Sequence, residues 1–210
     1  MPTYKLKLAF AKEDLQELLG GQYKVVVAKP TQRALEGREP TVAWQAFHPM
    51  ESNTITWEEP YGIYTSYAEI KPGVELEQMS QTDFPAADGK KYELSSAGYF
   101  GTPVGDGEAG SYYAINHYRE RPRLTMGLTQ DAIVNGESVE GHAISAATVL
   151  AGHTAQMTPH TKVSVWVQAD VSSNTVVTHI ASEPAGMDFG GSVTEHSYSY
   201  DLLSGTFISA

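Results

Sequence analysis

The chain contains no cysteine, which excludes disulfide bonds, thiolate metal sites and cysteine nucleophiles. It also has no apolar run long enough to span a membrane, because its longest apolar-leaning stretch, AISAATVLAG, is short and is interrupted by Ser and Thr. The first residues, MPTYKLKLAF, show no basic segment followed by an apolar one. We therefore expect no secretory signal, no membrane span and a cytoplasmic protein.

Positive charge is scarce. Lys and Arg number 14 against 25 Asp and Glu, and the formal net charge is −11. An acidic surface repels phosphate backbones and anionic lipids, so we expect neither nucleic acid nor a membrane as partner. Carbohydrate and protein partners remain compatible with this charge. With 210 residues and 41% hydrophobic content, the chain is expected to form a single domain over residues 1–210.

Motifs that would indicate catalysis or a cofactor are absent as well. There is no HExxH pair, no EF-hand loop, no phosphate-binding loop and no Gly-x-Ser-x-Gly turn, and no cofactor is predicted. His142, His153 and His160 follow one another closely, but their spacing fits no metal-ligand motif, so they are only weak metal candidates. Glu58 and Glu59 could serve glycoside hydrolysis, although neighbouring residues of a strand point to opposite faces.

Alternating apolar residues are the main pattern that is present. Tyr4, Leu6, Leu8 and Phe10 predict a strand, and KEDLQELLGG after it predicts one short helix that ends at Gly20–Gly21. About a dozen further short strands are predicted in QYKVVVA, VAWQAF, SNTITW, YGIYTSYAEI, VELEQMS, KKYELSS, RLTMGLT, HAISAATVL, KVSVWVQA, NTVVTHIAS, EHSYSYDL and GTFIS.

Polar and glycine-rich segments separate these strands. Residues 31–40 are predicted to form a turn, and a glycine-rich surface loop is predicted over residues 95–122. Many short strands with almost no helix predict an all-β fold, an antiparallel β-sandwich. A closed β-barrel is the alternative architecture.

The stretch NTITWEEPYGIYTSY raises the question of whether its rings form a binding surface or the core. Its bulky residues fall on one parity of the strand, which predicts that Trp57, Tyr61 and Ile63 are core residues. Tyr64 falls on the opposite parity and is therefore a candidate ligand-binding residue.

The same test applies to KVSVWVQA. It places Val163, Val165 and Val167 on the inner face, and Trp166 and Gln168 on the outer face. An outward Trp usually contacts a loop, a subunit or a ligand. Trp166 and Gln168 therefore join Tyr64 as predicted ligand-binding residues.

The order of features in the last third of the chain carries a resemblance to a known family. LTMGLT is followed by HAISAATVLAGHTAQMTPHTKVSVWVQAD, then by VVTHIAS, MDFGG and SYSYDLLSGTF. This layout resembles the rhizosphere-expressed protein family of soil bacteria, whose members are small and β-rich. The resemblance implies a soluble β-sandwich and transfers no catalytic residues. The segment between Gly98 and Pro122 and the N-terminal helix depart from that layout.

Three classes of function are compatible with these features. The first is a non-enzymatic binding protein, lectin-like or defence-related, that uses loops and outward aromatic rings on a β-sandwich. The second is a self-assembling structural or toxin-like subunit, in which case a homo-oligomer is expected. The third is a carbohydrate-active hydrolase with acids gathered from distant strands. The missing catalytic motifs favour the first class.

Overall fold

The computed structural model describes residues 2–31, 40–180 and 182–210, and most of its regular structure is β-strand. Strands account for 50% of the chain and helix for 4%, which confirms the predicted all-β class. Each sheet is open rather than closed on itself, so the sandwich-like architecture is confirmed over the closed alternative. The turn predicted for residues 31–40 lies almost entirely outside the described residues.

The largest sheet contains nine strands. Seven follow the order β19-β18-β1-β5-β11-β6-β7, and β12 and β13 both pair with β11. Its strands are β1 (Tyr4–Ala9), β5 (Ser52–Trp57), β6 (Gly62–Ser66), β7 (Ser80–Gln81), β11 (Arg123–Val134), β12 (Glu137–Ala143), β13 (Ala147–Leu150), β18 (Glu195–Asp201) and β19 (Thr206–Ser209).

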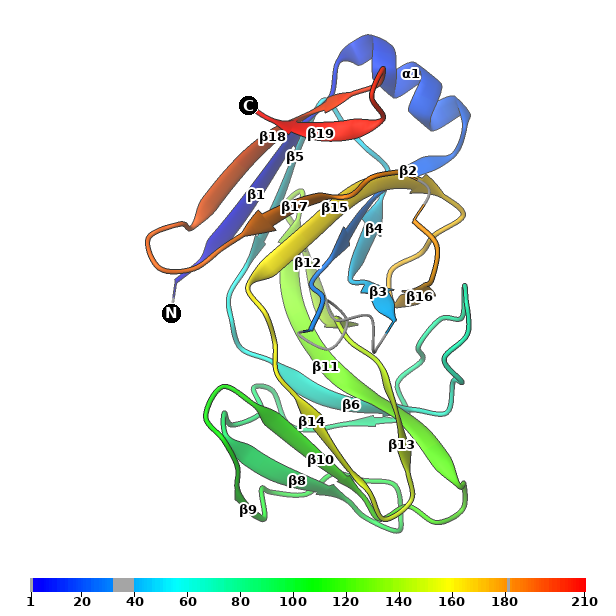
Figure 1. Ribbon diagram of the computed structural model, residues 1–210, viewed down its shortest axis with the longest axis vertical. Coiled ribbons are helices and arrows are strands. Elements are labelled where there is room, and N and C mark those ends of the chain that lie inside the picture. Colours follow the sequence, from blue (N-terminus) through cyan, green and yellow to red (C-terminus); the bar gives the residue numbers. More distant parts are fainter. Residues whose placement is uncertain (1, 32–39, 181) are drawn as a thin grey trace.

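Two four-stranded sheets and one two-stranded sheet complete the fold. The order β17-β15-β2-β4 occupies the upper half of the molecule and β14-β10-β8-β9 the lower half (Figure 1). Their strands are β2 (Tyr23–Ala28), β4 (Gln45–Phe47), β8 (Lys90–Leu94), β9 (Gly105–Asp106), β10 (Tyr112–Asn116), β14 (Thr154–Met157), β15 (Lys162–Ala169) and β17 (Ala185–Asp188). The small sheet pairs β3 (Thr41–Ala43) with β16 (Thr175–Val177).

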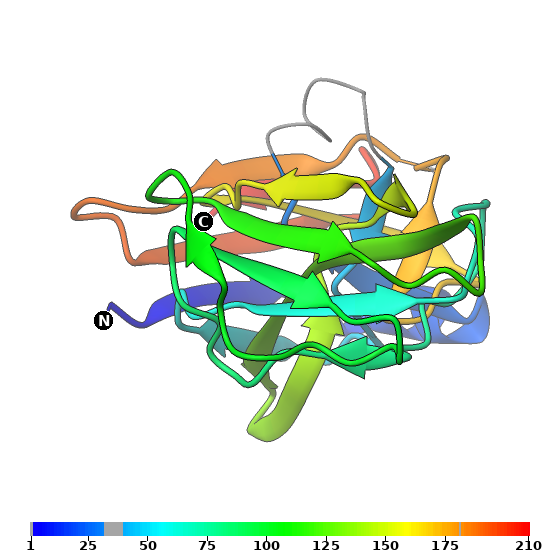
Figure 2. The same ribbon diagram turned by 90° about the horizontal axis from the view of Figure 1, so that it is seen from below.

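The long strand β11 joins the two halves. Its first half pairs with β6 and β13, and its second half pairs with β12 and β5. Asn135 and Gly136 connect β11 to β12 with φ angles of 52° and 89°, as a two-residue hairpin of type I′ requires. This hairpin projects from the body of the molecule in Figure 2.

The largest apolar core of the described residues lies between the sheets. Trp57, Tyr61 and Ile63 belong to it, as their parity predicts. The alternating residues of β1 are buried as well, and so are Val163, Val165 and Val167 of β15, all as predicted.

The predicted helix is α1 (Lys12–Gly20), and it ends at Gly21, whose N–H donates to the carbonyl oxygen of Glu17. Leu15 and Leu18 are buried, whereas Leu19 is exposed, because the helix presents only one narrow face to the sheets. This helix, the one found in the described part of the chain, lacks the length and apolar character needed to cross a bilayer.

Several strands depart from the predictions. The segment predicted as a glycine-rich loop contains β9 and β10, and β10 pairs in parallel with β8. β1 and β18 also pair in parallel, so the sandwich is mixed rather than purely antiparallel. VELEQMS contributes only the start of β7, and VAWQAF divides at Trp44 into β3 and β4. The sequence patterns did not predict β14 and β17.

Candidate binding groove

Trp166 and Tyr64 do not face solvent, so the prediction that they point outward is wrong. Trp166 lies on the face of β15 opposite the core valines, as parity requires, yet it is only 1% exposed. A second small core that includes Val26, Ala43 and Val171 covers it. Its indole Nε1 donates to Gln168 Oε1 at 2.9 Å. The face of β15 opposite the core valines is therefore covered around Trp166, and the half-buried Gln168 is the hydrogen-bond partner of this ring.

Tyr64 is buried too. Its hydroxyl donates to the carbonyl oxygen of Ser145 at 2.9 Å, and burial raises the pKa of this phenol. Val42, Leu76 and Val176 belong to the small apolar cluster that surrounds it. Neither predicted aromatic residue offers a ring face to a ligand.

The three histidines contact different parts of the backbone. His142 Nδ1 lies 3.1 Å from the carbonyl oxygen of Trp44, and burial lowers the pKa of this imidazole. His153 contacts the carbonyl oxygen of Ala151, and His160 accepts the N–H of Lys162. Among the residues the structure describes, no group of three or more His, Asp or Glu side chains could hold a metal ion.

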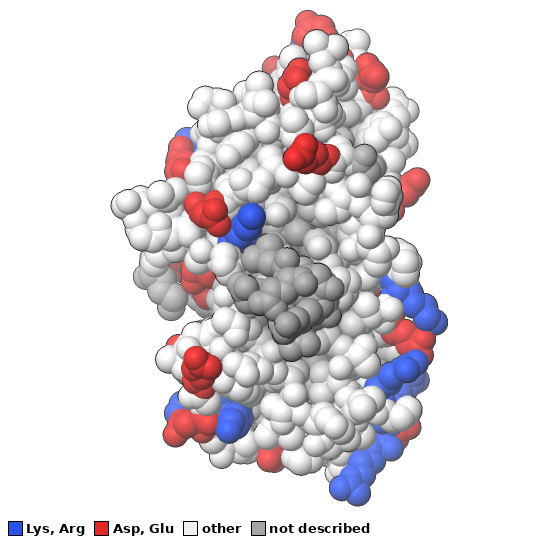
Figure 3. Space-filling view, viewed as in Figure 1, with Lys and Arg blue, Asp and Glu red and all other residues white. Residues whose placement is uncertain are grey.

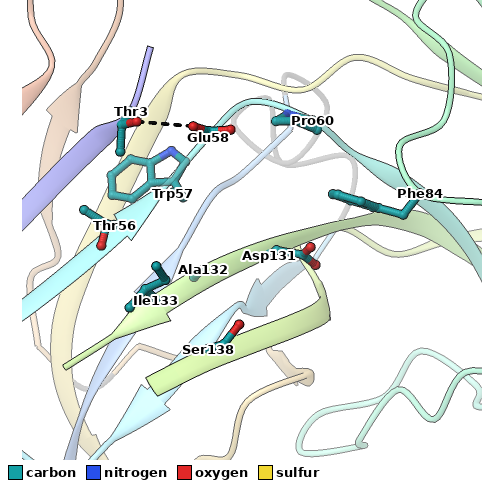
Figure 4. Close-up of a pocket in the computed structure, with 10 residues that line it drawn as sticks. All are labelled: Thr3, Thr56, Trp57, Glu58, Pro60, Phe84, Asp131, Ala132, Ile133 and Ser138. Atoms are coloured by element: carbon teal, nitrogen blue, oxygen red, sulfur yellow. Dashed lines mark hydrogen bonds between the residues drawn. The ribbon is translucent and has the colours of Figure 1, made fainter. Parts of the chain in front are cut away.

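A depression of about 380 Å³ opens between β5, the bulge of β11 and the loop before β8 (Figure 4). Trp57, Ala132 and Ile133 provide apolar surface, and the ring of Phe84 stands at one end. Polar groups surround this surface, and Thr3 Oγ1 donates to Glu58 Oε1 at 3.3 Å. The remaining lining residues are Thr56, Pro60, Asp131 and Ser138.

Three more depressions continue from this one. A second, of about 530 Å³, shares Phe84 and Asp131 with the first and adds Gln78, Gln81, Glu140 and Gly141. A third, of about 370 Å³, shares Gln78 with the second and adds Ser66, Tyr67, Ala68, Glu75, Glu77 and Met79.

The fourth depression, also of about 370 Å³, shares Tyr67 and Ala68 with the third and ends at Arg121 and Arg123. We call these four depressions together the groove. Asp131 and Arg123 are eight residues apart on β11. A strand rises about 3.3 Å per residue, so the groove runs for roughly 25 Å.

Phe84 is the aromatic residue most open to solvent in the first two depressions. Its side chain remains 46% exposed, and one edge of the ring lies over Gly62 of β6. A Cβ atom at Gly62 would lie 3.3 Å from Phe84 Cδ2. The ring can therefore rest on the strand because Gly62 has no side chain.

Asp131 enters the groove because of a β-bulge. Gln130 pairs with His142 and Ala132 pairs with Val139, so Glu140 and Gly141 of β12 together oppose Asp131 alone. Gly141 adopts a φ of 65°, and its N–H donates to Asp131 Oδ1 at 2.7 Å. A bulge of this kind bends the strand and changes the direction of a side chain. Here it fixes one carboxylate oxygen, and among the described residues Oδ2 has no hydrogen-bond partner.

Behind the groove, Trp57 also forms part of a buried cluster around Lys29. Lys29 is 1% exposed, and its Nζ lies 5.3, 5.5 and 5.6 Å from the ring centroids of Trp57, Tyr61 and Trp44. Glu59 Oε1 accepts a hydrogen bond from this ammonium at 3.2 Å, and Tyr61 donates its hydroxyl to the other Glu59 oxygen. Burial lowers the pKa of Lys29 to about 8, while Glu59 opposes that shift.

This cluster holds the groove wall in one position. Ring faces and a carboxylate surround the ammonium, which offsets part of the cost of burying it. Glu58, adjacent to Glu59, faces the groove instead, as the alternation of side chains predicts.

The sequence analysis did not single out Phe84 or Asp131. The signal available for Phe84 is an aromatic residue in the polar turn QTDFPAADG, where no strand partner would bury it. The signal for the hairpin beside Asp131 is Asn135–Gly136, the dipeptide that favours a two-residue β-turn.

Comparison with known proteins gives no match: no family model, no curated protein and no solved structure is similar to this chain. The fold and the groove therefore define it as an all-β, sandwich-like protein with an extended surface groove. The resemblance to the rhizosphere-expressed family stays a prediction.

Proposed function

We propose that this protein is a non-enzymatic, lectin-like binding protein that holds an extended oligosaccharide in the groove. The observation that carries the proposal is the half-exposed ring of Phe84, which stands between two depressions lined by carboxylate and amide groups. An aromatic ring packs on the apolar face of a sugar, while carboxylates and amides bind its hydroxyl groups. Oδ2 of Asp131, which has no hydrogen-bond partner in the described part of the chain, and the side chain of Gln81 are the polar partners beside Phe84.

The form of the groove favours an extended chain over a single sugar. Each depression shares lining residues with the next, three of the four include residues of β11, and roughly 25 Å of length accommodates several sugar units. The buried Lys29 cluster keeps the Trp57 wall fixed, so little ordering cost accompanies binding.

Tryptophan fluorescence offers a direct test. All three tryptophans are buried, but Trp57 lines the first depression of the groove, whereas Trp44 and Trp166 line none of its four depressions. We expect a saturable change in emission when neutral oligosaccharides of increasing length are added. Trp57→Phe should remove the change, and Trp166→Phe should leave it.

Two substitutions locate the site. Phe84→Ala should weaken binding about fivefold or more, since loss of one stacked ring costs about 1 kcal/mol or more. Tyr99→Ala is the matched control, because Tyr99 is 70% exposed and does not line the groove. Absence of binding across a broad panel of glycans, confirmed by calorimetry, would refute the proposal.

A second candidate is hydrolysis of the bound glycan. Glu58 and Asp131 line the same depression, and a pair of carboxylates is the machinery most glycosidases use. Appearance of new reducing ends on prolonged incubation, lost in both Glu58→Gln and Asp131→Asn, would favour this activity over simple binding.

A further inference from the structure

One end of the groove carries positive charge in a chain whose net charge is −11. Figure 3 shows acidic side chains over the upper end near α1 and basic side chains gathered along the lower right edge. Lys71, Arg121 and Arg123 line the fourth depression there, together with a single carboxylate, Glu69. The two ends of the groove therefore differ in charge, since the first depression is lined by Glu58 and Asp131.

Arg123 and Lys71 share Glu69. Arg123 Nη2 lies 2.8 Å from Glu69 Oε1, and Lys71 Nζ lies 2.7 Å from Glu69 Oε2. The hydrogen bonds from Lys71 and Arg123 lower the pKa of Glu69 to about 2, so this carboxylate stays ionised. One carboxylate among three cations leaves this end with a net charge of +2.

Arg121 is the cation that remains without a carboxylate among the described residues. Its guanidinium carbon lies 4.3 Å from the centroid of the Tyr67 ring. The hydroxyls of Tyr67 and Tyr118 lie 2.7 Å apart, and Tyr118 donates to Glu120, so this ring is held in place. A guanidinium stacked on a fixed ring keeps its edge N–H groups available for a planar oxyanion.

The middle of the groove has the opposite charge. Its depressions are lined by Glu75, Glu77, Asp131 and Glu140. A ligand that carried negative charge along its whole length would be repelled there. The groove therefore fits a chain of neutral sugars with an anionic group at one end.

We propose that the end of the groove formed by Lys71, Arg121 and Arg123 binds the oxyanion of a terminal acidic sugar, a carboxylate or a sulfate. This inference rests on the proposed function, because it names the class of oligosaccharide that the groove takes. The neutral part of the chain lies along Phe84 and Asp131, and the acidic sugar contacts Arg121.

The experiment compares three forms of one oligosaccharide by calorimetry. They are the neutral chain that binds best, the same chain ending in a uronic acid, and the same chain carrying one terminal sulfate ester. We expect at least one acidic form to bind about tenfold more tightly than the neutral form, with the preference falling as salt is added. The comparison of the two acidic forms identifies the oxyanion.

Substitutions separate this end from the rest of the groove. Arg121→Gln should remove the preference for the acidic form, so that the acidic and neutral chains bind the variant equally. Arg121→Lys should keep only part of the preference for the acidic form, because an ammonium group cannot form the bidentate contact. Lys90→Gln is the charge-matched control, since Lys90 lies on β8 and lines no part of the groove.

The two proposals fail in distinguishable ways. Equal binding of neutral and acidic chains by the native protein, unaffected by Arg121→Gln, would overturn the anionic end and leave the proposed function standing. If no neutral chain binds, the proposed function fails, and methyl glucuronide and sulfate are then titrated alone. Backbone amide chemical shifts that move at Arg121 and at residues 123–125 would support the anionic end, and unchanged shifts would overturn it.

Discussion

The ammonium group of Lys29 lies 5.3 Å from the centroid of the Trp57 ring, and Trp57 also lines the groove. A buried charge and a candidate binding surface thus share one side chain. Glu59 completes the arrangement through a 3.2 Å contact between its Oε1 and Lys29 Nζ. The ionisation state of Lys29 should therefore affect the stability of the groove wall that Trp57 forms. This effect can be measured as a change in protein stability with pH.

The stability of the protein should rise between pH 8 and pH 10. Burial lowers the pKa of Lys29 to about 8 in the folded state, from 10.5 in the unfolded chain. Within this window the unfolded state binds more protons, so raising the pH favours the folded state by about 2 kcal/mol. Urea unfolding at several pH values measures this change.

Above pH 10 other groups oppose this trend. Burial raises the pKa values of Tyr61 and Tyr64, so unfolded tyrosines lose their protons first and stability falls. Lys29→Met should remove the rise below pH 10, whereas Lys12→Met, on the exposed side of α1, should retain it. If the stability of Lys29→Met rose with pH in parallel with that of the native protein, Lys29 would not be the group that causes the rise.

The adjacent acids Glu58 and Glu59 should contribute differently to the stability of the protein. Glu59→Gln should destabilise the protein at pH 7 by about 2 kcal/mol, because it leaves the buried ammonium of Lys29 without its carboxylate. The value is at the low end for a buried ion pair because Glu59 is 23% exposed. Glu58→Gln is the control and should change stability little, since the one hydrogen bond of the Glu58 side chain among the described residues is the exposed bond from Thr3. Equal effects of both substitutions on thermal unfolding would argue against the Lys29–Glu59 pairing.

Much of the fold could be predicted because the alternation of apolar and polar residues along a strand indicates the face of the sheet on which each side chain lies. It placed Trp57 in the core and Trp166 opposite the β15 valines, and both placements are correct. It could not report what covers each face. Trp166 is buried because β3, β16 and the chain beyond β15 form a second small core over it, and these contacts join residues far apart in the sequence.

The groove was harder to predict because it depends on register. The predicted strand RLTMGLT ends before Asp131, and only the pairing of Gln130 with His142 and Ala132 with Val139 shows that the strand continues and that a bulge lies there. The four depressions come from β5, β6, β7, β11, β12 and the loops between them. No local pattern encodes how these segments meet.

The centre of β11 gives a third prediction. A Cβ atom at Gly127 would lie 2.0 Å from the carbonyl oxygen of Ser145 and 2.7 Å from the ring of Tyr64. Gly127→Ala should therefore destabilise the protein by about 3 kcal/mol or more, since backbone must move to relieve the overlap. Gly101→Ala is the control, because nothing lies within 4 Å of its Cβ position. An unchanged melting temperature for Gly127→Ala would show that β11 and the Ser145 segment are not packed this closely.

The bulge at Gly141 links backbone conformation to binding. Gly141 and Gly136 lie on the same hairpin with φ angles of 65° and 89°, a region that costs alanine about 1 kcal/mol. Both Gly141→Ala and Gly136→Ala should lower stability by this amount, and neither introduces a close contact. Only Gly141 donates its N–H to Asp131, so only Gly141→Ala should also weaken oligosaccharide binding, by several-fold in calorimetry. If the two variants bind the oligosaccharide equally well, the orientation of Asp131 by the bulge does not contribute to binding.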